Sequence, residues 1–585
     1  MDSEHIFFGE RYKYYISLIV ILFLVYFNCL FGAFVWDDVF QIKNNFVIHS
    51  ISNIPKFFLG STYAPTGLSG NLVGDWYRPL LTLSFSIIYT LFGAQPLFFH
   101  LFQLTIHILN GILLFVFLKK FFKERVAFFL SLLFLVHPIN VEAVSYISGL
   151  NDPLFFLFGI LALILSLNEQ ISMKRMFVVG FLLLCSLLSK ETGILFLIII
   201  FAYRSIFKYK KSDLISTTLL LLVPTLIYFY LRFFVAKISN QGLSDAPITT
   251  IPIIERVFTM PAIILFYLKT FFFPKDLFTF QYWIITQPSL QFYLPLIIDS
   301  TFLIGIITLG IWIYRRRKAL FSSFLFFTLW LLVGIGLHMQ IIPLDMTVSD
   351  RWFYFPMVGM LGMLGVFVET IQHPSVRLKN LATVIIITII AIFSLRTVIQ
   401  NTYWQDGISL FSYNLQLKSH DSGVENFLAL ELARAGKLDE AQKLFENLVI
   451  TYPIESSSIF VTHSERVLFI NNLATVDEAK GDVPKAKALY EKILDTDETG
   501  DVYFALAVIT LQNERKPTEA KKLAQKGLLK YPNDASLWEV IAEADYVLGN
   551  RQDALIEIKK AKDISPSPGI IRLYNGMHLF KSGHF

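Results

Sequence analysis

Residues 15–36 read YISLIVILFLVYFNCLFGAFVW, and the pair Asp37-Asp38 follows directly. A helix needs about 20 apolar residues to cross the hydrocarbon core of a bilayer, and this run is long enough. It is too long for the apolar part of a secretory signal peptide, and it lacks a small-residue cleavage site. It therefore predicts an anchor that is kept, with two carboxylates just beyond its outer end.

The composition of the chain fits a protein that crosses the membrane many times. Of its 585 residues, 55% are hydrophobic and only 16% are charged, so an ordinary soluble enzyme is excluded. The net charge is only +5, and Lys and Arg lie in short clusters between apolar runs, which indicates topology signals and not a nucleic-acid face. The two cysteines, Cys29 and Cys185, lie inside apolar runs, which excludes a disulfide framework and a cysteine zinc site.

Further apolar runs predict additional membrane helices. Runs of spanning length are Leu97–Leu118, Val126–Val144, Leu214–Val235, Leu294–Tyr314, Leu320–Ile342, Trp352–Val368 and Leu381–Leu395; shorter ones are Pro153–Leu167, Met176–Leu188 and Ile194–Tyr203. Placing the basic clusters in the cytoplasm requires Met176–Tyr203 to be a hairpin with Lys190 at its outer tip. Val257–Phe273 must then lie in the interface or re-enter, and the same is expected of Pro79–Phe92 because it is too short to span. The result is about eleven spans, outer loops at 37–78 and 236–291, and an outward-facing tail.

Beyond Asn401 the sequence becomes charged and amphipathic, with an internal repeat. Ala486, Ala520 and Ala554 are 34 residues apart, which is the tetratricopeptide period. Ala441 precedes Ala486 by 45 residues, so the first repeat carries an insertion. The predicted fold is therefore all-α: a membrane helix bundle over residues 1–399 and an α-solenoid of tetratricopeptide repeats over residues 400–585.

Several acidic and histidine side chains are expected at the outer membrane edge: Asp37, Asp38, His137, Glu142 and Asp152. Adjacent carboxylates such as Asp37-Asp38 can serve as a general base and a neighbour that tunes its pKa, or can cap a helix end. Asp152 is also a candidate helix cap because Pro153 follows it. Contact of the His137 and Glu142 side chains with lipid would be energetically unfavourable, so these residues are expected to line a cavity. A metal site would need a third ligand, so these two residues alone are weak evidence for one.

Four cations are expected at the same level: Arg78, Lys190, Arg232 and Arg351. One cation near the end of a span usually reaches towards lipid headgroups. Four of them beside a group of carboxylates indicate a phosphate-binding cavity as the alternative.

These motifs occur in an order that resembles a known family. In chain order they are the Asp37-Asp38 pair, Arg78–Thr82 (RPLLT), His137–Val144 (HPINVEAV), Lys190–Gly193 (KETG), Asp350–Pro356 (DRWFYFP) and the repeat tail. Together they resemble the transmembrane-and-tetratricopeptide O-mannosyltransferases and their prokaryotic relatives, within the C-type glycosyltransferase superfamily.

The resemblance implies an inverting glycosyltransferase that uses a polyprenyl-phosphate sugar. A hexose such as mannose would move to an acceptor hydroxyl, with a protein acceptor held by the repeats, and with a glycan or lipid acceptor as the alternative. Asp37 would be the base with Asp38 as its partner, and Arg351 the contact to the donor phosphate. The resemblance implies acceptor positioning or cavity shaping for His137, Glu142, Asp152 and Lys190.

The remaining expectations concern cofactor and compartment. A monophosphate leaving group can be stabilised by Arg and Lys, so no metal is obligatory, although relatives with pyrophosphate donors take a divalent ion. A transporter or a membrane-anchored scaffold is the non-enzymatic alternative; charges gathered at one face favour an enzyme over a transporter, which places them at mid-membrane. The chain has no Asn-x-Ser/Thr sequon, which favours a bacterial inner membrane with a periplasmic tail over the endoplasmic reticulum.

Overall fold

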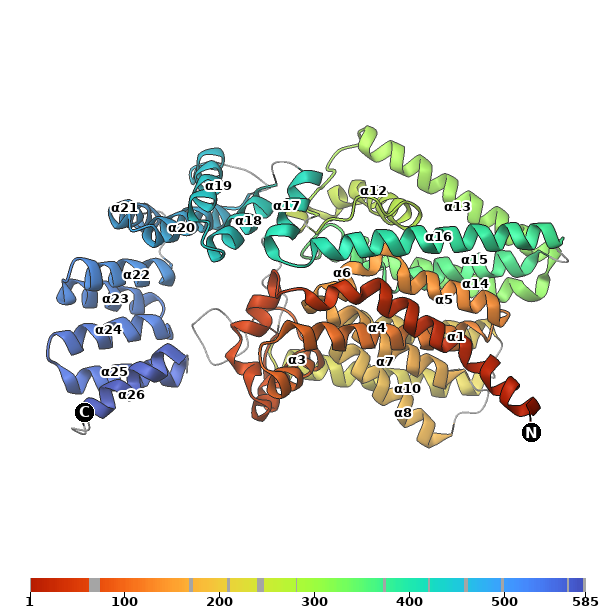
Figure 1. Cartoon of the computed structure of the whole chain (residues 1–585), viewed down its shortest axis with the longest axis horizontal. Helices are drawn as coiled ribbons and strands as arrows, with labels where there is room; N and C mark the ends of the chain where they lie inside the picture. The colour runs from red at the N-terminus through yellow and green to blue at the C-terminus, as the bar shows by residue number, and fades with distance from the viewer. Residues whose placement is uncertain are drawn as a thin grey trace. The chain divides into compact units, whose positions relative to one another are not determined.

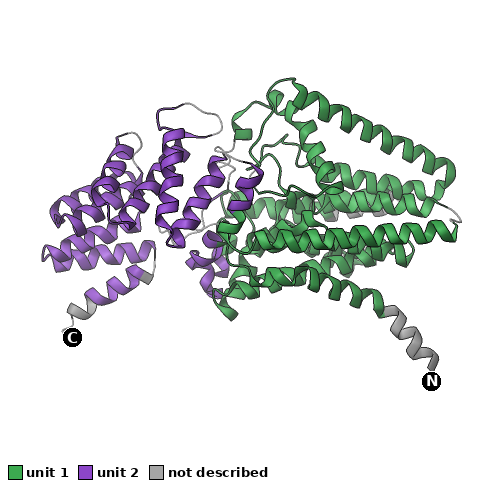
Figure 2. Cartoon of the chain, turned by 45° about the horizontal axis from the view of Figure 1, so that its top comes forward, with its two compact units in different colours: residues 1–38, 57–62, 75–410 green, residues 39–56, 63–74, 411–585 purple. Residues whose placement is uncertain are grey.

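The computed structural model describes residues 2–62, 74–167, 172–207, 211–238, 247–279, 281–371, 375–418, 421–456, 461–495, 499–565 and 568–581. In these ranges the regular structure is helical and contains no strand. The chain forms two compact units (Figure 2): residues 1–38, 57–62 and 75–410 make the membrane unit, and residues 39–56, 63–74 and 411–585 make the tail unit. The predicted all-α fold is confirmed, whereas the domain division at residue 400 stays a prediction.

The membrane unit is built from long apolar helices (Figure 1). Its helices are α1 (Asp2–Tyr26), α3 (Pro79–Phe92), α4 (Pro96–Leu118), α5 (Glu124–Val136), α6 (Val141–Ser145), α7 (Asn151–Ser166), α8 (Met173–Ser189), α9 (Ile194–Ile206), α10 (Lys211–Phe229), α11 (Pro247–Thr250), α12 (Ile253–Phe272), α13 (Leu290–Arg316), α14 (Lys318–Gly336), α15 (Pro356–Thr370) and α16 (Val376–Tyr403); the short α2 (Ile54–Leu59) falls at the junction of the two units.

The structure gives six helices that are long and apolar enough to cross a membrane, or seven if α5 and α6 form one bent span. These counts concern only the described residues. Three shorter apolar helices accompany them: Pro79–Phe92, Leu221–Val235 and Pro356–Thr370. The protein is therefore an integral membrane protein, while the predicted total of about eleven spans is not confirmed.

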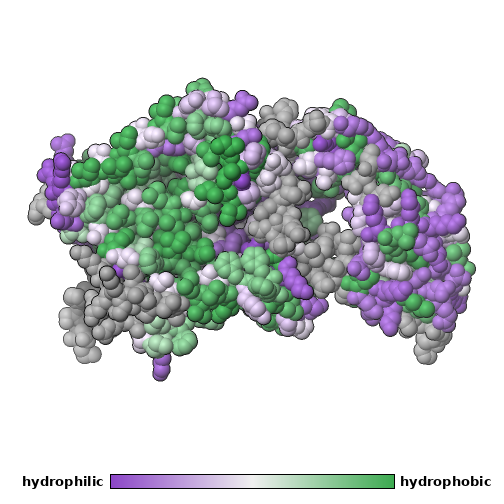
Figure 3. Space-filling model, turned by 180° about the vertical axis from the view of Figure 1, so that it is seen from behind, coloured by the Kyte–Doolittle hydropathy of each residue, from purple (hydrophilic) through white to green (hydrophobic). Residues whose placement is uncertain are grey.

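The core of the membrane unit centres on α4, which packs against α1, α5 and α7, while α14 packs against α9 and α15. The face of the membrane unit seen in Figure 3 is strongly hydrophobic. On α13, for example, Ile304 is 63% exposed and Ile307 is 54% exposed. Such a surface supports contact with lipid, because a soluble monomer rarely exposes an apolar patch of this kind.

Two predicted interruptions occur where the sequence placed them. The helical hairpin of α8 and α9 breaks at Lys190, and Glu191–Gly193 form a single tight turn. Helix α3 has the bounds predicted from the apolar run, Pro79–Phe92, because Pro79 starts it in the first turn and Gly93 follows its end. Both interruptions bring charged residues next to apolar helix ends.

The tail unit contains the repeat helices. They are α17 (Gly407–Leu417), α18 (Ser422–Arg434), α19 (Leu438–Thr451), α20 (His463–Ala479), α21 (Val483–Leu494), α22 (Gly500–Val508), α23 (Pro517–Lys530), α24 (Ala535–Val547), α25 (Arg551–Ile564) and α26 (Pro568–Lys581), with α17 spanning the junction of the two units. Helices α18 to α25 pack as four consecutive pairs. The repeat alanines Ala441, Ala486, Ala520 and Ala554 are all 0% exposed, as expected of small residues at which paired helices approach closely.

Candidate functional site

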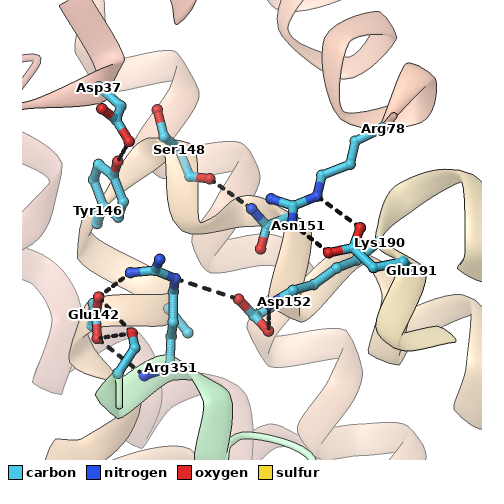
Figure 4. A network of polar contacts seen from close by, with 12 residues as sticks. Asp37, Arg78, Glu142, Tyr146, Ser148, Asn151, Asp152, Lys190, Glu191 and Arg351 are labelled. Carbon is cyan, nitrogen blue, oxygen red and sulfur yellow. Dashed lines mark hydrogen bonds and ion pairs between the residues drawn. The ribbon is translucent and has the colours of Figure 1, made fainter. Parts of the chain in front are cut away.

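A cluster of charged side chains lies where the chain breaks between α5 and α7 (Figure 4). The carbonyls of Ala143 and Tyr146 each accept a hydrogen bond of 2.7 Å from Gln103 of α4. At Gly149 a side chain is excluded, because a Cβ atom would lie 2.8 Å from the carbonyl oxygen of Glu142. The segment that carries Glu142, Tyr146 and Asp152 is therefore fixed against the bundle.

The two acidic residues of the first outer loop have different environments. Asp37 is partly exposed, and its carboxylate accepts a hydrogen bond of 2.7 Å from the hydroxyl of Tyr146. Asp38 is 0% exposed and accepts hydrogen bonds from the backbone N–H of Val35 (3.1 Å) and from the N–H and hydroxyl of Ser148 (2.7 and 2.6 Å). Asp37 can therefore meet an acceptor, whereas Asp38 joins the end of the first span to the segment before α7.

Arg351 lies between two buried carboxylates. Its side chain is 12% exposed, and one terminal nitrogen, Nη1, forms an ion pair with Glu142, which is 4% exposed. Glu142 also accepts hydrogen bonds from the Ser349 hydroxyl (3.0 Å to each oxygen) and the backbone N–H of Arg351 (3.1 Å). The Nε atom of Arg351 lies 3.8 Å from Asp152. Isolated buried charges are very unfavourable, so these groups stabilise one another.

Asp152 connects Arg351 to Lys190 at the tip of the helical hairpin. The ammonium group of Lys190 donates to Asp152 at 2.6 Å, and the two side chains are 6% and 3% exposed. The predicted alternative for Asp152, a helix cap, receives no support from a hydrogen bond: the N-terminal position of α7 has no side-chain cap. Asp152 therefore serves mainly as the shared partner of two cations.

Arg78 pairs with Glu191, the residue after Lys190. Its Nε and Nη2 atoms donate to the two carboxylate oxygens at 3.2 and 2.7 Å, and the guanidinium carbon lies 4.4 Å from the centre of the Trp76 ring. Burial alone would raise the pKa of Glu191, but the Arg78 guanidinium outweighs it and lowers the pKa to about 2. This bidentate pair fixes the start of α3 against the α8–α9 hairpin.

Two predicted site residues have other partners. Arg232 donates to the Tyr228 hydroxyl and to the Asp75 carbonyl, each at 3.2 Å. His137 is 1% exposed; its Nε2 lies 2.9 Å from the Phe271 carbonyl, and its Nδ1 accepts from the Ile139 N–H at 3.2 Å. Because both ring nitrogens of His137 contact backbone groups, the structure gives it the role of fixing the bend between α5 and α6.

Four of the predicted residues thus form one continuous group with Asp37: Glu142, Asp152, Lys190 and Arg351 are linked to it through Tyr146. Sequence reasoning did not select Tyr146, Ser148, Ser349 or Glu191 as site residues. Glu191 lies within the quoted Lys190–Gly193 motif and Ser349 directly precedes the quoted Asp350–Pro356 motif, and this proximity to selected residues was the available signal. Tyr146 and Ser148 are uncharged, so the charge pattern could not identify them.

The cations retain donors that can meet an anion. No described residue accepts a hydrogen bond from Nη2 of Arg351, and among described residues only Asp152 accepts from the Lys190 ammonium group. A guanidinium binds phosphate oxygens through two parallel N–H donors, and an ammonium group has three donors. The site therefore combines an accessible carboxylate with cations suited to a phosphate group.

Comparison with known proteins finds relatives that are similar in sequence to this chain. No family model matches the chain. Protein O-mannosyl-transferase TMTC3 from Homo sapiens is 24% identical over 570 residues, covering 88% of this chain and 60% of that protein. Protein O-mannosyl-transferase F38B6.6 from Caenorhabditis elegans is 26% identical, covering 74% of this chain and 62% of that protein. TMTC1 from Homo sapiens is 36% identical over 186 residues, or 29% of this chain and 21% of that protein.

These matches confirm the resemblance drawn from the motifs, since relatives that match most of the chain are named O-mannosyl-transferases. The chain spans about 60% of the length of the first of these relatives.

Proposed function

We propose that the protein is an inverting glycosyltransferase that moves a hexose, mannose by analogy with its relatives, from a polyprenyl-phosphate carrier to a protein hydroxyl. The observation that carries this proposal is the placement of Asp37 and Arg351 around one side chain, Tyr146. A base and a phosphate ligand are the two groups that such a transfer needs. The names of the relatives supply the reaction class and the protein acceptor.

The proposed reaction is a single displacement at the anomeric carbon. The acceptor hydroxyl oxygen forms a bond to that carbon while the bond from the carbon to the carrier phosphate breaks, and the configuration inverts. The proton of the hydroxyl passes to the Asp37 carboxylate, which acts as general base. The carrier leaves as polyprenyl phosphate.

Arg351 stabilises the leaving phosphate in this proposal. Negative charge grows on the phosphate as its bond to the sugar breaks, so a preorganised cation lowers the barrier. Arg351 is preorganised because Glu142 and Asp152 hold its Nη1 and Nε atoms. Lys190, held by Asp152, adds a second cation on the same side.

The positive charges of Arg351 and Lys190 support a reaction without an obligatory metal. A monophosphate leaving group develops less charge than a pyrophosphate, and Arg and Lys donors can neutralise it. We therefore propose that chelation leaves transfer unchanged.

We propose that the site and the tail lie on the side of the membrane opposite to the cytoplasm. The positive-inside rule assigns the basic clusters of the sequence to the cytoplasm, which supports this orientation. The lack of Asn-x-Ser/Thr sequons supports a bacterial inner membrane, with the tail in the periplasm. The tail would then present the protein acceptor on the same side as Asp37.

The test is single-turnover transfer from a synthetic polyprenyl-phosphate mannose to acceptor peptides by the purified full chain. Asp37→Asn keeps the size of the side chain but cannot take a proton, so we expect transfer to fall by about 10²- to 10⁴-fold. The matched control is Asp276→Asn: Asp276 lies in the loop between α12 and α13, is 41% exposed and pairs only weakly with Lys269 at 3.6 Å.

The control variant should transfer at the wild-type rate, and all variants should elute as monodisperse protein. Wild-type rates for Asp37→Asn would exclude Asp37 as the base. A wild-type protein that hydrolyses or ignores the donor with every acceptor tested would overturn the proposed function.

A further inference from the structure

Tyr146 contacts the proposed base and the proposed phosphate ligand at once. Its hydroxyl donates to Asp37 at 2.7 Å, and the guanidinium carbon of Arg351 lies 5.9 Å from the centre of its ring. Figure 4 shows the hydroxyl end of Tyr146 directed at Asp37, with Arg351 near the opposite end of the side chain. A change in this one side chain would therefore affect both groups.

The Tyr146 ring is held rigidly. It is stacked on Trp36, with ring centres 5.3 Å apart and planes 19° apart, and on Trp404, with ring centres 5.3 Å apart and planes 29° apart. The whole residue is only 2% exposed. Because aromatic stacking restricts both side-chain torsions, the hydroxyl can point in essentially one direction.

The backbone before Asp37 carries strain that this stack maintains. Trp36 has a φ of 51°, which lies in the left-handed region that bulky residues rarely occupy. Conformations of this kind persist only where surrounding contacts enforce them. The Trp36 ring is fixed against Tyr146, so the same contact that orders Tyr146 also directs the chain into Asp37.

We propose that Tyr146 is the positioning residue of the transfer reaction, and that its hydroxyl orients the Asp37 carboxylate and favours its ionised form. This inference rests on the proposed function, in which Asp37 is the base. A hydroxyl that donates to a carboxylate stabilises the charged form relative to the neutral one. Because the Tyr146 ring is stacked on Trp36 and Trp404, its hydroxyl can hold the carboxylate of the loop residue Asp37 in one orientation.

The charged groups around this pair define the expected pH behaviour. Asp38 is next to Asp37 in the chain and is fully buried, and the guanidinium carbon of Arg351 lies 5.9 Å from the centre of the Tyr146 ring. Glu142 offsets part of the Arg351 charge through their ion pair. None of these groups changes when the Tyr146 hydroxyl alone is removed.

Tyr146→Phe is the decisive variant, because it keeps the ring, its stacking and the Arg351 contact. Loss of a hydrogen bond to a charged group corresponds to about one pH unit or more in the pKa of the acceptor. We expect kcat to fall about tenfold, KM for the donor to stay unchanged, and the acid limb of the kcat/KM profile to move up by about one pH unit.

Two further variants separate positioning from a structural role. Tyr26→Phe is the matched control: Tyr26 is a fully buried tyrosine of α1 whose hydroxyl has no hydrogen-bond partner in the described structure, so its pH profile should equal that of the wild type. Tyr146→Leu removes the ring as well and should also raise KM for the donor, because Arg351 loses its aromatic neighbour.

The outcomes are distinct. A Tyr146→Phe variant with the wild-type kcat and acid limb would overturn the inference while the proposed function stands. A lower melting temperature with an unmoved acid limb would reduce Tyr146 to a structural residue and would also overturn it. Absence of transfer by the wild-type protein would instead contradict the proposed function itself.

Discussion

Asp38 shows how burial separates two adjacent carboxylates. It is fully buried, and this desolvation raises its pKa from the ordinary value of 3.8 to about 7, against the opposing effect of hydrogen bonds from Ser148 and Val35; the charge of Asp37 adds to the rise. At neutral pH a large fraction of Asp38 is therefore protonated. Its role is to hold the first outer loop against Ser148, which suits a partner of the base better than the base itself.

The raised pKa of Asp38 predicts a specific dependence of stability on pH. A group whose pKa is higher in the folded state contributes stability that is complete below its unfolded pKa of about 4 and is lost as the pH rises through its folded pKa of about 7. We expect the melting temperature of the wild type, relative to Asp38→Asn, to decrease between pH 4 and pH 8. The full effect is on the order of 4 kcal/mol.

Thermal unfolding of the detergent-solubilised chain at several pH values measures this difference. Asn cannot ionise, so Asp38→Asn supplies the baseline, and Asp276→Asn should follow the wild type throughout. A difference that is constant, or that grows in favour of the wild type with rising pH, would contradict the inferred environment of Asp38.

At the scale of an element, the turns within the repeats depend on backbone conformation. Gly436, Gly481 and Gly549 have φ values of 77°, 86° and 86° and lie between the two helices of their pairs. At Gly549 a Cβ would meet nothing within 4 Å, so the requirement for glycine is conformational and not a matter of space. In the third pair, Arg515 takes this position with a φ of 55°.

Two glycine substitutions in the tail should therefore change its stability in opposite directions. Gly549→Ala forces a Cβ into the left-handed region and should destabilise the α24–α25 pair by about 1–2 kcal/mol. Gly576→Ala replaces an exposed glycine inside α26 with open space around it, and should stabilise by about 0.5–1 kcal/mol. Hydrogen exchange of the full chain, followed in α24–α26, reports both; equal effects of the two variants would refute the conformational explanation.

At the scale of the whole molecule, the sidedness of the chain is the main prediction. The mechanism requires the tail and Asp37 on one side, with the Arg315–Lys318 basic cluster on the other. Cys29 and Cys185 are both buried, so an introduced cysteine can be labelled selectively. In intact cells, a membrane-impermeant thiol reagent should label Gln552→Cys in the tail and should label Ala319→Cys only after permeabilisation.

Both introduced positions are exposed in the structure, so poor labelling cannot come from burial in the fold. Labelling of Ala319→Cys in intact cells, with Gln552→Cys protected, would reverse the orientation. That result would place the proposed site in the cytoplasm and would remove the basis for an outer-face transfer.

The sequence by itself determined the helical class, the repeats and most of the helix positions. Apolar runs and proline positions are local properties, so they placed α3, the break at Lys190 and the repeat alanines without knowledge of any long-range contact. Local patterns also selected Glu142, Asp152, Lys190 and Arg351, because a charged residue at the edge of an apolar run can be recognised in the sequence without knowledge of the tertiary structure.

Only the tertiary structure decided which of these charges meet. Arg351 and Glu142 are more than 200 residues apart in the chain, and Arg78 and Glu191 more than 100, so their pairing depends on how the helices pack. The same packing gave His137 two backbone partners and joined Arg232 to Tyr228. It also stacked Tyr146 on Trp36 and on Trp404. No local pattern encodes this arrangement, because hydrogen bonding and stacking depend on distances that packing alone sets.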